Sequence, residues 1–389
     1  MNTPKIRFKE FNDEWKYEPL SNYVDRIITK NKDNASSLVL TISAQFGLVD
    51  QTRFFNKNVS SNNLAGYYLL NKGDFAYNKS YSNGYPWGAI KRLNKYNMGV
   101  VSSLYICFKP NKKINSDYLE QYFETNKWYH QMSEVSVEGA RNHGLLNIAV
   151  GDFFSTEHFI PTLDEQKKIS KFLSLLYKKI ELQSKKIEDL KLFKKGLIET
   201  EFTNSNYNEI NLKNILKERK LYSEKGLEYP HVTLSKDGIY DKGERYNRDF
   251  LVKSEDKKYK ITYLNDLCYN QANLKFGVIC LNEYGSAIFS PIYVTFEINS
   301  IANPKYIKYY TMRNNFINAI RKYEQGTVYE RMAVAPEDFL KFNIKLPNIE
   351  TQNKIVLKLS KLDKKLQLEE NKLSKLTVLK KGLMQSMFV

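Results

Sequence analysis

The residues best able to carry out catalytic or metal-dependent chemistry are few, and their spacing assembles no site. The chain has neither the His-Glu-x-x-His pattern of metal-dependent hydrolases nor a phosphate-binding Gly-x-x-x-x-Gly-Lys-Ser/Thr loop. The acidic pair Asp13-Glu14 near Lys16 has a nuclease-like composition, but such short patterns arise by chance in a chain that is 26% charged. We therefore expect no catalytic residue and no metal site. The histidines lie apart from one another, at His130, His143, His158 and His231.

The segment Asn303-Pro304-Lys305-Tyr306 is the strongest candidate for an enzyme motif, because it looks like a degraded Asn/Asp-Pro-Pro-Tyr sequence of adenine N6 methyltransferases. It aligns with Ser116-Asp117-Tyr118, a helix start, and Asn followed by Pro is favourable at a helix N-terminus. No Phe-x-Gly-x-Gly loop is present to hold a methyl donor. We therefore interpret this segment as a helix cap.

Cysteine use and hydropathy predict a cytoplasmic protein without a membrane span. Cys107, Cys268 and Cys280 lie at unrelated spacings within apolar, strand-like runs, so neither a disulfide framework nor a zinc site is expected. The N-terminus is polar and charged, and no apolar run of about eighteen residues occurs.

The charge of the chain favours a polyanionic partner. The 60 Lys and Arg exceed the 43 Asp and Glu, which gives a formal net charge of +17. The 28 Tyr and 22 Phe could stack on bases, although most of them must fill hydrophobic cores. At 389 residues with 42% hydrophobic content, the chain is long enough for two ordinary domains.

An internal repeat organises the chain. Pro161–Phe202 aligns without a gap with Pro347–Phe388, and both copies contain Lys-Lys-Gly-Leu near their ends. Apolar residues at spacings of three and four predict a coiled-coil seam in each copy. Polar residues interrupt both seams at matching places, Gln183 with Glu369 and Lys194 with Lys380. The predicted seams comprise Ile169, Leu173, Leu176, Ile180, Ile187, Leu190 and Leu197, and Ile355, Leu359, Leu362, Leu366, Leu373, Leu376 and Leu383.

Two matching seams of about thirty residues are natural partners for each other, and we expect them to run antiparallel. The alternative is that each helix is an ordinary amphipathic helix lying on its own domain. A helix of this length spans roughly 45 Å, comparable with the distance of roughly 34 to 36 Å between sites one DNA turn apart. The pair could therefore act as a ruler.

The segments that precede the two helices repeat more loosely. Thr41–Asp50 and Thr233–Asp241 both read as strand, turn and strand, and Gly73–Asn78 matches Asn265–Asn270. A core strand follows in each copy, at Ser103–Phe108 and Pro291–Phe296, and then a helical stretch, at 117–132 and 304–323. We predict an α+β fold with two mixed α/β globular domains joined by an antiparallel intramolecular coiled coil, with pseudo-twofold symmetry. The predicted boundaries are 1–158 and 204–345 for the domains, and 159–203 and 346–389 for the helices.

Polar side chains with directional donors gather on three loops of each copy, beside basic residues. Asn and Gln can pair with adenine, and Lys with guanine or phosphate, if these modules read bases. A solvated surface loop is the alternative for any single residue. The candidates in the first copy are Gln45, Asn78, Lys79, Tyr81, Asn83, Tyr85, Arg141, Asn142 and His143, and those in the second are Lys236, Gln271, Asn273, Lys275, Tyr329 and Arg331.

These features together resemble the specificity subunit of type I restriction-modification systems along nearly the whole chain. The resemblance rests on the Pro-x-x-x-x-Gln starts at Pro161 and Pro347, the seams, and the closing Lys-Lys-Gly-Leu. The second copy departs from the usual Glu-Gln, with Thr351 before Gln352.

The resemblance implies two target recognition domains, each reading half of a bipartite site in double-stranded DNA. It also implies two methyltransferase subunits that use S-adenosylmethionine and methylate adenine, and motor-nuclease subunits that use ATP and Mg²⁺. This chain would be non-catalytic and would need no cofactor of its own. The alternatives are a system that methylates without cutting, a stand-alone DNA-modifying enzyme, and a coiled-coil scaffold.

Overall fold

The computed structural model describes residues 3–56, 63–82, 84–136, 146–203, 207–223, 229–242, 258–325 and 333–389. It divides into two compact units. Unit 1 comprises residues 1–184 and 371–389, and unit 2 comprises residues 185–370. Each unit therefore contains one globular module and a segment of both long helices, α5 (Leu163–Phe202) and α10 (Ile349–Ser386).

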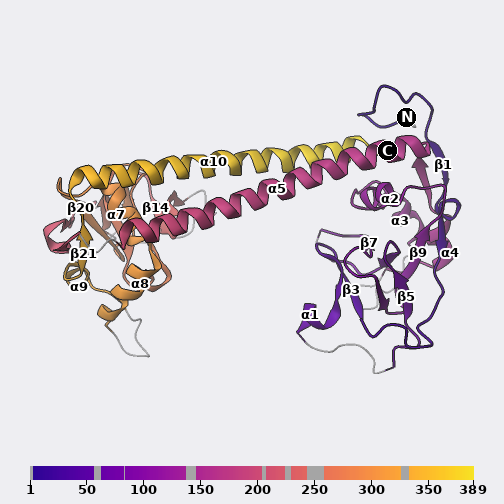
Figure 1. Ribbon diagram of the computed structural model, residues 1–389, viewed down its shortest axis with the longest axis horizontal. Helices are drawn as coiled ribbons and strands as arrows, with labels where there is room; N and C mark the ends of the chain where they lie inside the picture. Colours follow the sequence, from indigo (N-terminus) through magenta and orange to yellow (C-terminus); the bar gives the residue numbers. More distant parts are fainter. Residues whose placement is uncertain are drawn as a thin grey trace. The chain divides into compact units, whose positions relative to one another are not determined.

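Unit 1 is built on a four-stranded antiparallel sheet of order β2-β9-β6-β7. Three antiparallel pairs, β1-β10, β3-β4 and β5-β8, accompany it, and α2 packs against β7 (Figure 1). Its strands are β1 (Lys16–Pro19), β2 (Val24–Arg26), β3 (Leu40–Ser43), β4 (Gly47–Asp50), β5 (Tyr68–Asn71), β6 (Phe75–Asn78), β7 (Ala89–Arg92), β8 (Met98–Val101), β9 (Ile106–Pro110) and β10 (Glu157–Ile160). Its short helices are α1 (Gln51–Phe55), α2 (Ser116–Phe123), α3 (Tyr129–Val135) and α4 (Val150–Ser155).

Unit 2 repeats this topology. A four-stranded sheet of order β12-β20-β17-β18 matches that of unit 1, and the pairs β11-β21 and β14-β15 match β1-β10 and β3-β4. Its strands are β11 (Asn208–Asn211), β12 (Leu216–Glu218), β13 (Tyr222–Ser223), β14 (Val232–Ser235), β15 (Gly238–Asp241), β16 (Tyr259–Thr262), β17 (Leu267–Asn270), β18 (Ile279–Leu281), β19 (Ala287–Phe289), β20 (Tyr293–Ile298) and β21 (Asn343–Leu346). Its short helices are α7 (Pro304–Thr311), α8 (Asn314–Ile320) and α9 (Pro336–Leu340). The predicted duplication of a mixed strand and helix module is confirmed.

The long helices pack antiparallel within each unit, as predicted. In unit 2, Lys186 pairs with Glu369 and Glu201 pairs with Lys358, so the partner number falls as the residue number rises. In unit 1, the hydroxyl of Tyr177 lies 3.2 Å from the sulfur of Met384. Every predicted seam residue is buried or half-buried, and the seam residue Gln183 is also buried. The helices have 40 and 38 residues and are therefore longer than the heptad pattern alone indicated.

Each globular core is completed by residues from both long helices. Ile169 and Leu173 of α5 join Met384 and Phe388, at the other end of the chain, in the core of unit 1. In unit 2 the corresponding cluster contains Phe202 of α5 and, among others from α10, Leu359. A fully buried Leu or Phe side chain contributes about 1.5–3 kcal/mol relative to exposure. The helix ends are thus part of the domains as well as of the helical pair.

The predicted helical stretches 117–132 and 304–323 are each broken into two short helices. After α2, the Thr125 hydroxyl donates to Tyr122 O at 2.6 Å and the Trp128 indole donates to Phe123 O at 3.1 Å. After α7, the guanidinium of Arg313 donates to Tyr310 O. Side chains therefore satisfy carbonyls that a continuous helix would satisfy with backbone amides, and the chain turns there.

The repeated glutamine of the Pro-x-x-x-x-Gln segments joins each long helix to its own module. Buried Gln166 accepts from the backbone amide of Asn115, the N-cap of α2, at 2.7 Å and donates to Pro161 O at 2.9 Å. Gln352 makes the same two bonds, with Asn303 and Pro347. Because buried backbone groups need partners, this explains why the residue recurs in both copies.

We expect Gln166→Met to destabilise unit 1 by about 3 kcal/mol, because two buried backbone groups lose their partner. Trp15, Trp87 and Trp128 are the only tryptophans in the chain and all lie in unit 1, so urea unfolding followed by tryptophan fluorescence reports on this unit. The control is exposed Lys171→Met, which should change the free energy of unfolding by less than about 0.5 kcal/mol. Equal effects would contradict the proposed role of Gln166.

His158 of β10 is a second buried polar group in unit 1. Its Nδ1 lies 2.8 Å from the Tyr122 hydroxyl and its Nε2 lies 2.9 Å from the Thr156 hydroxyl. Thr156 donates its proton to Phe153 O, so we infer that it accepts from Nε2–H and that Tyr122 donates to Nδ1. Burial lowers the pKa of His158 to about 3.

The unfolded chain therefore takes up a proton on His158 near its ordinary pKa of about 6.5, whereas the folded protein does so only near pH 3. We expect this residue's contribution to stability to be complete above pH 6.5 and to fall by up to about 1.4 kcal/mol per pH unit below it. His158→Gln should remove that slope. Urea unfolding followed by tryptophan fluorescence from pH 7 to 4 measures it, and parallel profiles for the two proteins would show that the inference is wrong.

Candidate nucleic-acid interface

Two of the predicted loops of unit 1 come together. The β3–β4 turn carries Gln45, and Asn78 ends β6 at the start of the β6–β7 connection, which also contains Tyr85. All three line one cavity of about 350 Å³, together with Phe46, Ser80 and Ser82, which the sequence did not single out. The concavity therefore presents amide and hydroxyl groups beside aromatic rings, the kinds of group that read base edges and stack on bases.

The β6–β7 connection closes through a required glycine. Gly88 has φ +76°, and a Cβ at this position would lie 2.1 Å from Asn78 O. Any other residue would clash with the strand that begins the loop. Reciprocal backbone hydrogen bonds between Ser82 and Tyr85 tighten the tip, and the Asn78 carboxamide accepts from Ser80 N at 3.1 Å. The tight closure fixes where Asn78 and Tyr85 lie.

The other candidates of the first copy are placed differently. Exposed Tyr81 projects from the β6–β7 connection with 58% of its surface accessible. The ammonium of Lys79 donates to Ile148 O at 2.9 Å, so this side chain anchors a neighbouring segment. The remaining predicted contacts of this copy, Asn83, Arg141, Asn142 and His143, lie outside the described residues.

In unit 2, the candidates lie on two separate turns. Exposed Lys236 occupies the β14–β15 turn, and Gln271, Asn273 and Lys275 follow β17. Buried Asn270 shapes the second turn, since its carboxamide accepts from the backbone amides at 272 and 273, both at 3.1 Å. Tyr329 and Arg331 lie outside the described residues.

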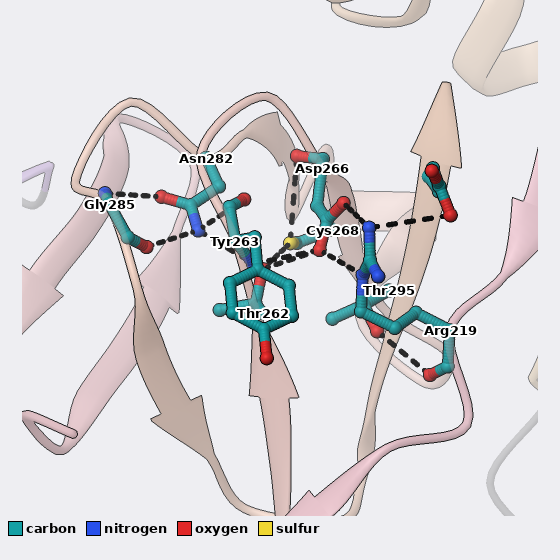
Figure 2. A network of polar contacts seen from close by, with 9 residues as sticks. Arg219, Thr262, Tyr263, Asp266, Cys268, Asn282, Gly285 and Thr295 are labelled. Carbon is teal, nitrogen blue, oxygen red and sulfur yellow. Dashed lines mark hydrogen bonds and ion pairs between the residues drawn. The ribbon is translucent and has the colours of Figure 1, made fainter. Parts of the chain in front are cut away.

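A buried polar network holds the turn that precedes β17, and sequence inspection did not predict it (Figure 2). Arg219 binds both carboxylate oxygens of Asp266, at 2.8 and 3.0 Å, and Asp266 is 2% exposed. The same carboxylate accepts from Tyr263 N at 2.8 Å, and the guanidinium of Arg219 lies over the Tyr263 ring. Asn282 extends the network to Thr262 and to the backbone of Tyr263. The base of the strand that leads to Gln271 is thus rigidly held.

Unit 1 uses a simpler device at the equivalent turn. Asp74 accepts from Asn71 N at 2.7 Å, and burial raises the pKa of its carboxyl. Within the described ranges, no arginine or lysine lies within ion-pair distance of Asp74. The two modules therefore share a scaffold but differ in the contacts that hold matched loops.

The structure also bears on the alternative enzyme motif. Asn303 is the N-cap of α7, its side chain accepts from Lys305 N and Tyr306 N, and Pro304 occupies the first turn. The cap interpretation is confirmed. Across the part of the chain that the structure describes, no group of three or more His, Cys, Asp or Glu residues could hold a metal ion, and no helix is both long and apolar enough to cross a membrane.

The fold matches solved structures over nearly the whole chain. The HsdS subunit from Thermoanaerobacter tengcongensis aligns with a TM-score of 0.52 and 14% identity, over 96% of this chain and 96% of that one. A chain from a structural study of complex assembly and conformational transition of the type I R-M system aligns with a TM-score of 0.58 and 14% identity, over 98% and 99%. The type I restriction-modification S subunit from M. genitalium aligns with a TM-score of 0.52 and 14% identity, over 100% and 99%. No family model and no curated protein matches the sequence.

We expect Asp266→Asn to destabilise unit 2 by about 3 kcal/mol, because it leaves the half-buried Arg219 guanidinium without its carboxylate. Amide hydrogen exchange should accelerate in β16, β17 and the turn between them, whose Tyr263 amide is bonded to Asp266. Asp74→Asn is the matched control in unit 1 and should cost only about 1 kcal/mol. Equal losses in the two units would contradict the importance of the arginine pair.

Proposed function

We propose that this chain is the DNA-specificity subunit of a type I restriction-modification complex, with one half of a bipartite site read by each unit. The observation that carries the proposal is the duplicated architecture, two modules of one topology with two long helices, which shares the fold of HsdS structures over 96–100% of its length. The net charge of +17 is of the sign that DNA requires.

The reading surface proposed for unit 1 is the cavity formed by the β3–β4 turn and the β6–β7 connection. Gln45 is exposed there, and the amide nitrogen of Asn78 is available because only its oxygen bonds to Ser80. A carboxamide can pair with adenine through two hydrogen bonds, and each good pair discriminates against a wrong base by about 1–3 kcal/mol. For unit 2 we propose the turns that carry Lys236 and Gln271–Lys275. Different loops on one scaffold permit two different half-sites.

In this proposal the chain contributes recognition and its partners contribute chemistry. Two methyltransferase subunits would bring S-adenosylmethionine and methylate adenine, and motor-nuclease subunits would bring ATP and Mg²⁺. The long helices would set the gap between the half-sites, since a 40-residue helix is about 60 Å long. The repeated sequence of the two helices supports assembly with two copies of one partner.

The test is a map of methylated adenines made with the full chain and its methyltransferase subunits. Gln45→Ala combined with Asn78→Ala should relax base preference by about 10- to 100-fold at one half-site, because about 1–3 kcal/mol of discrimination is lost per contact. The other half-site and the gap should not change.

Gln271→Ala combined with Asn273→Ala is the reciprocal control and should relax only the other half-site. Loss of methylation at every sequence alike would instead indicate a general defect in assembly. The proposal is wrong if both double variants alter the same half-site, or if neither alters base preference.

A further inference from the structure

A second cavity in unit 1 is lined by charged side chains and is separate in chemistry from the amide-lined concavity. It has a volume of about 340 Å³ and lies where β7 and α2 meet the segments of α5 and α10 that belong to this unit. The β3–β4 turn forms its rim. Its lining includes Gln45, Lys91, Arg92, Gln121, Tyr177 and Lys380.

The cavity holds more positive than negative charge. Lys91, which is 8% exposed, pairs with Glu124 at 2.5 Å, and Arg92 pairs with Glu120, also at 2.5 Å. Half-buried Lys380 has its ammonium 3.8 Å from the centre of the Tyr177 ring. Among the described residues, no carboxylate lies within ion-pair distance of Lys380. Burial lowers its pKa, and Glu124 partly opposes this effect.

The second unit shows what the first one lacks. In the aligned repeat, Lys194 stands for Lys380 and Asp363 stands for Tyr177. Lys194 forms an ion pair with Asp363, and the Tyr309 hydroxyl donates to the same carboxylate at 2.6 Å. The repeated lysine of Lys-Lys-Gly-Leu thus meets a carboxylate in unit 2 and an aromatic ring in unit 1.

A buried amide gives a second, independent sign of a missing ligand. Gln121, at the place that Tyr309 occupies in unit 2, is 6% exposed and donates through its amide nitrogen to Ser170 O and the Ser174 hydroxyl, both at 3.1 Å. Its Oε1 has no hydrogen-bond partner in the described part of the structure. Buried polar groups without partners are rare and costly.

We propose that this cavity binds a phosphate-bearing ligand, whose phosphate oxygens lie between Lys380 and Lys91 and replace the carboxylate that Asp363 supplies in unit 2. Lysine ammonium groups bind phosphate strongly where water is partly excluded. The volume exceeds that of a phosphate ion and leaves room for a sugar or base beside Gln45. The phosphate comes either from a free nucleotide or from the backbone of bound DNA. The site does not depend on which bases the protein reads.

The test measures binding of inorganic phosphate, adenosine monophosphate, adenosine and a short DNA duplex to the full chain, by calorimetry and by tryptophan-monitored unfolding of unit 1. Tyr177→Asp supplies in unit 1 the carboxylate of unit 2, so it should weaken binding at least 10-fold, whereas Tyr177→Phe should bind like the wild type. Adenosine, which lacks phosphate, should not bind.

Lys380→Met should weaken binding as Tyr177→Asp does, and the matched Lys194→Met in unit 2 should leave it unchanged. This pair keeps the test decisive if Tyr177→Asp fails to fold. Loss confined to free phosphate and nucleotide would identify a soluble ligand, and loss confined to the duplex would identify a backbone phosphate. Unchanged binding of every probe by both Tyr177→Asp and Lys380→Met, or equal loss in Lys194→Met, would overturn the proposal.

Discussion

Burial of apolar side chains from both long helices in each globular core is the constraint on which the rest of the structure depends. Leu173 is fully buried in the first core and Leu359 in the second, and each belongs to a different helix. A helix with a single apolar stripe would suffice to pack against its partner, but here the stripe also closes a domain at each end. The apolar residues at the start and the end of each helix therefore serve two packing partners, which accounts for the close repetition of the two helices in sequence.

The sequence predicted the elements whose pattern is local and periodic. The seams from Ile169 to Leu197 and from Ile355 to Leu383 follow a spacing of three and four over many turns, and the structure buries them as expected. The cap at Asn303 was equally legible, because its chemistry involves only neighbouring residues. Capping and periodicity are encoded within a few residues, so one sequence suffices to find them.

Contacts between residues distant in the chain were not predictable in the same way. Arg219 meets Asp266 across 47 positions, and Gln166 meets Asn115 across 51, and neither spacing carries a periodic signal. Lys79 looked like a phosphate contact from its composition and neighbours, whereas its ammonium binds a backbone carbonyl in its own unit. For the candidate site, sequence identified loops correctly as places where polar residues gather, but tertiary packing decides which of those side chains remain available.

The closure of the first core by Met384, Met387 and Phe388 has a consequence for the order in which the protein can mature on the ribosome. Domains generally fold during synthesis from the N-terminus, at about 5–20 residues per second. Here the first module leaves the ribosome early but acquires the last part of its core only when translation is nearly complete. A truncated product would therefore expose apolar surface on its first module and be open to proteolysis, so that a chain carrying one finished reading module without the second should not accumulate.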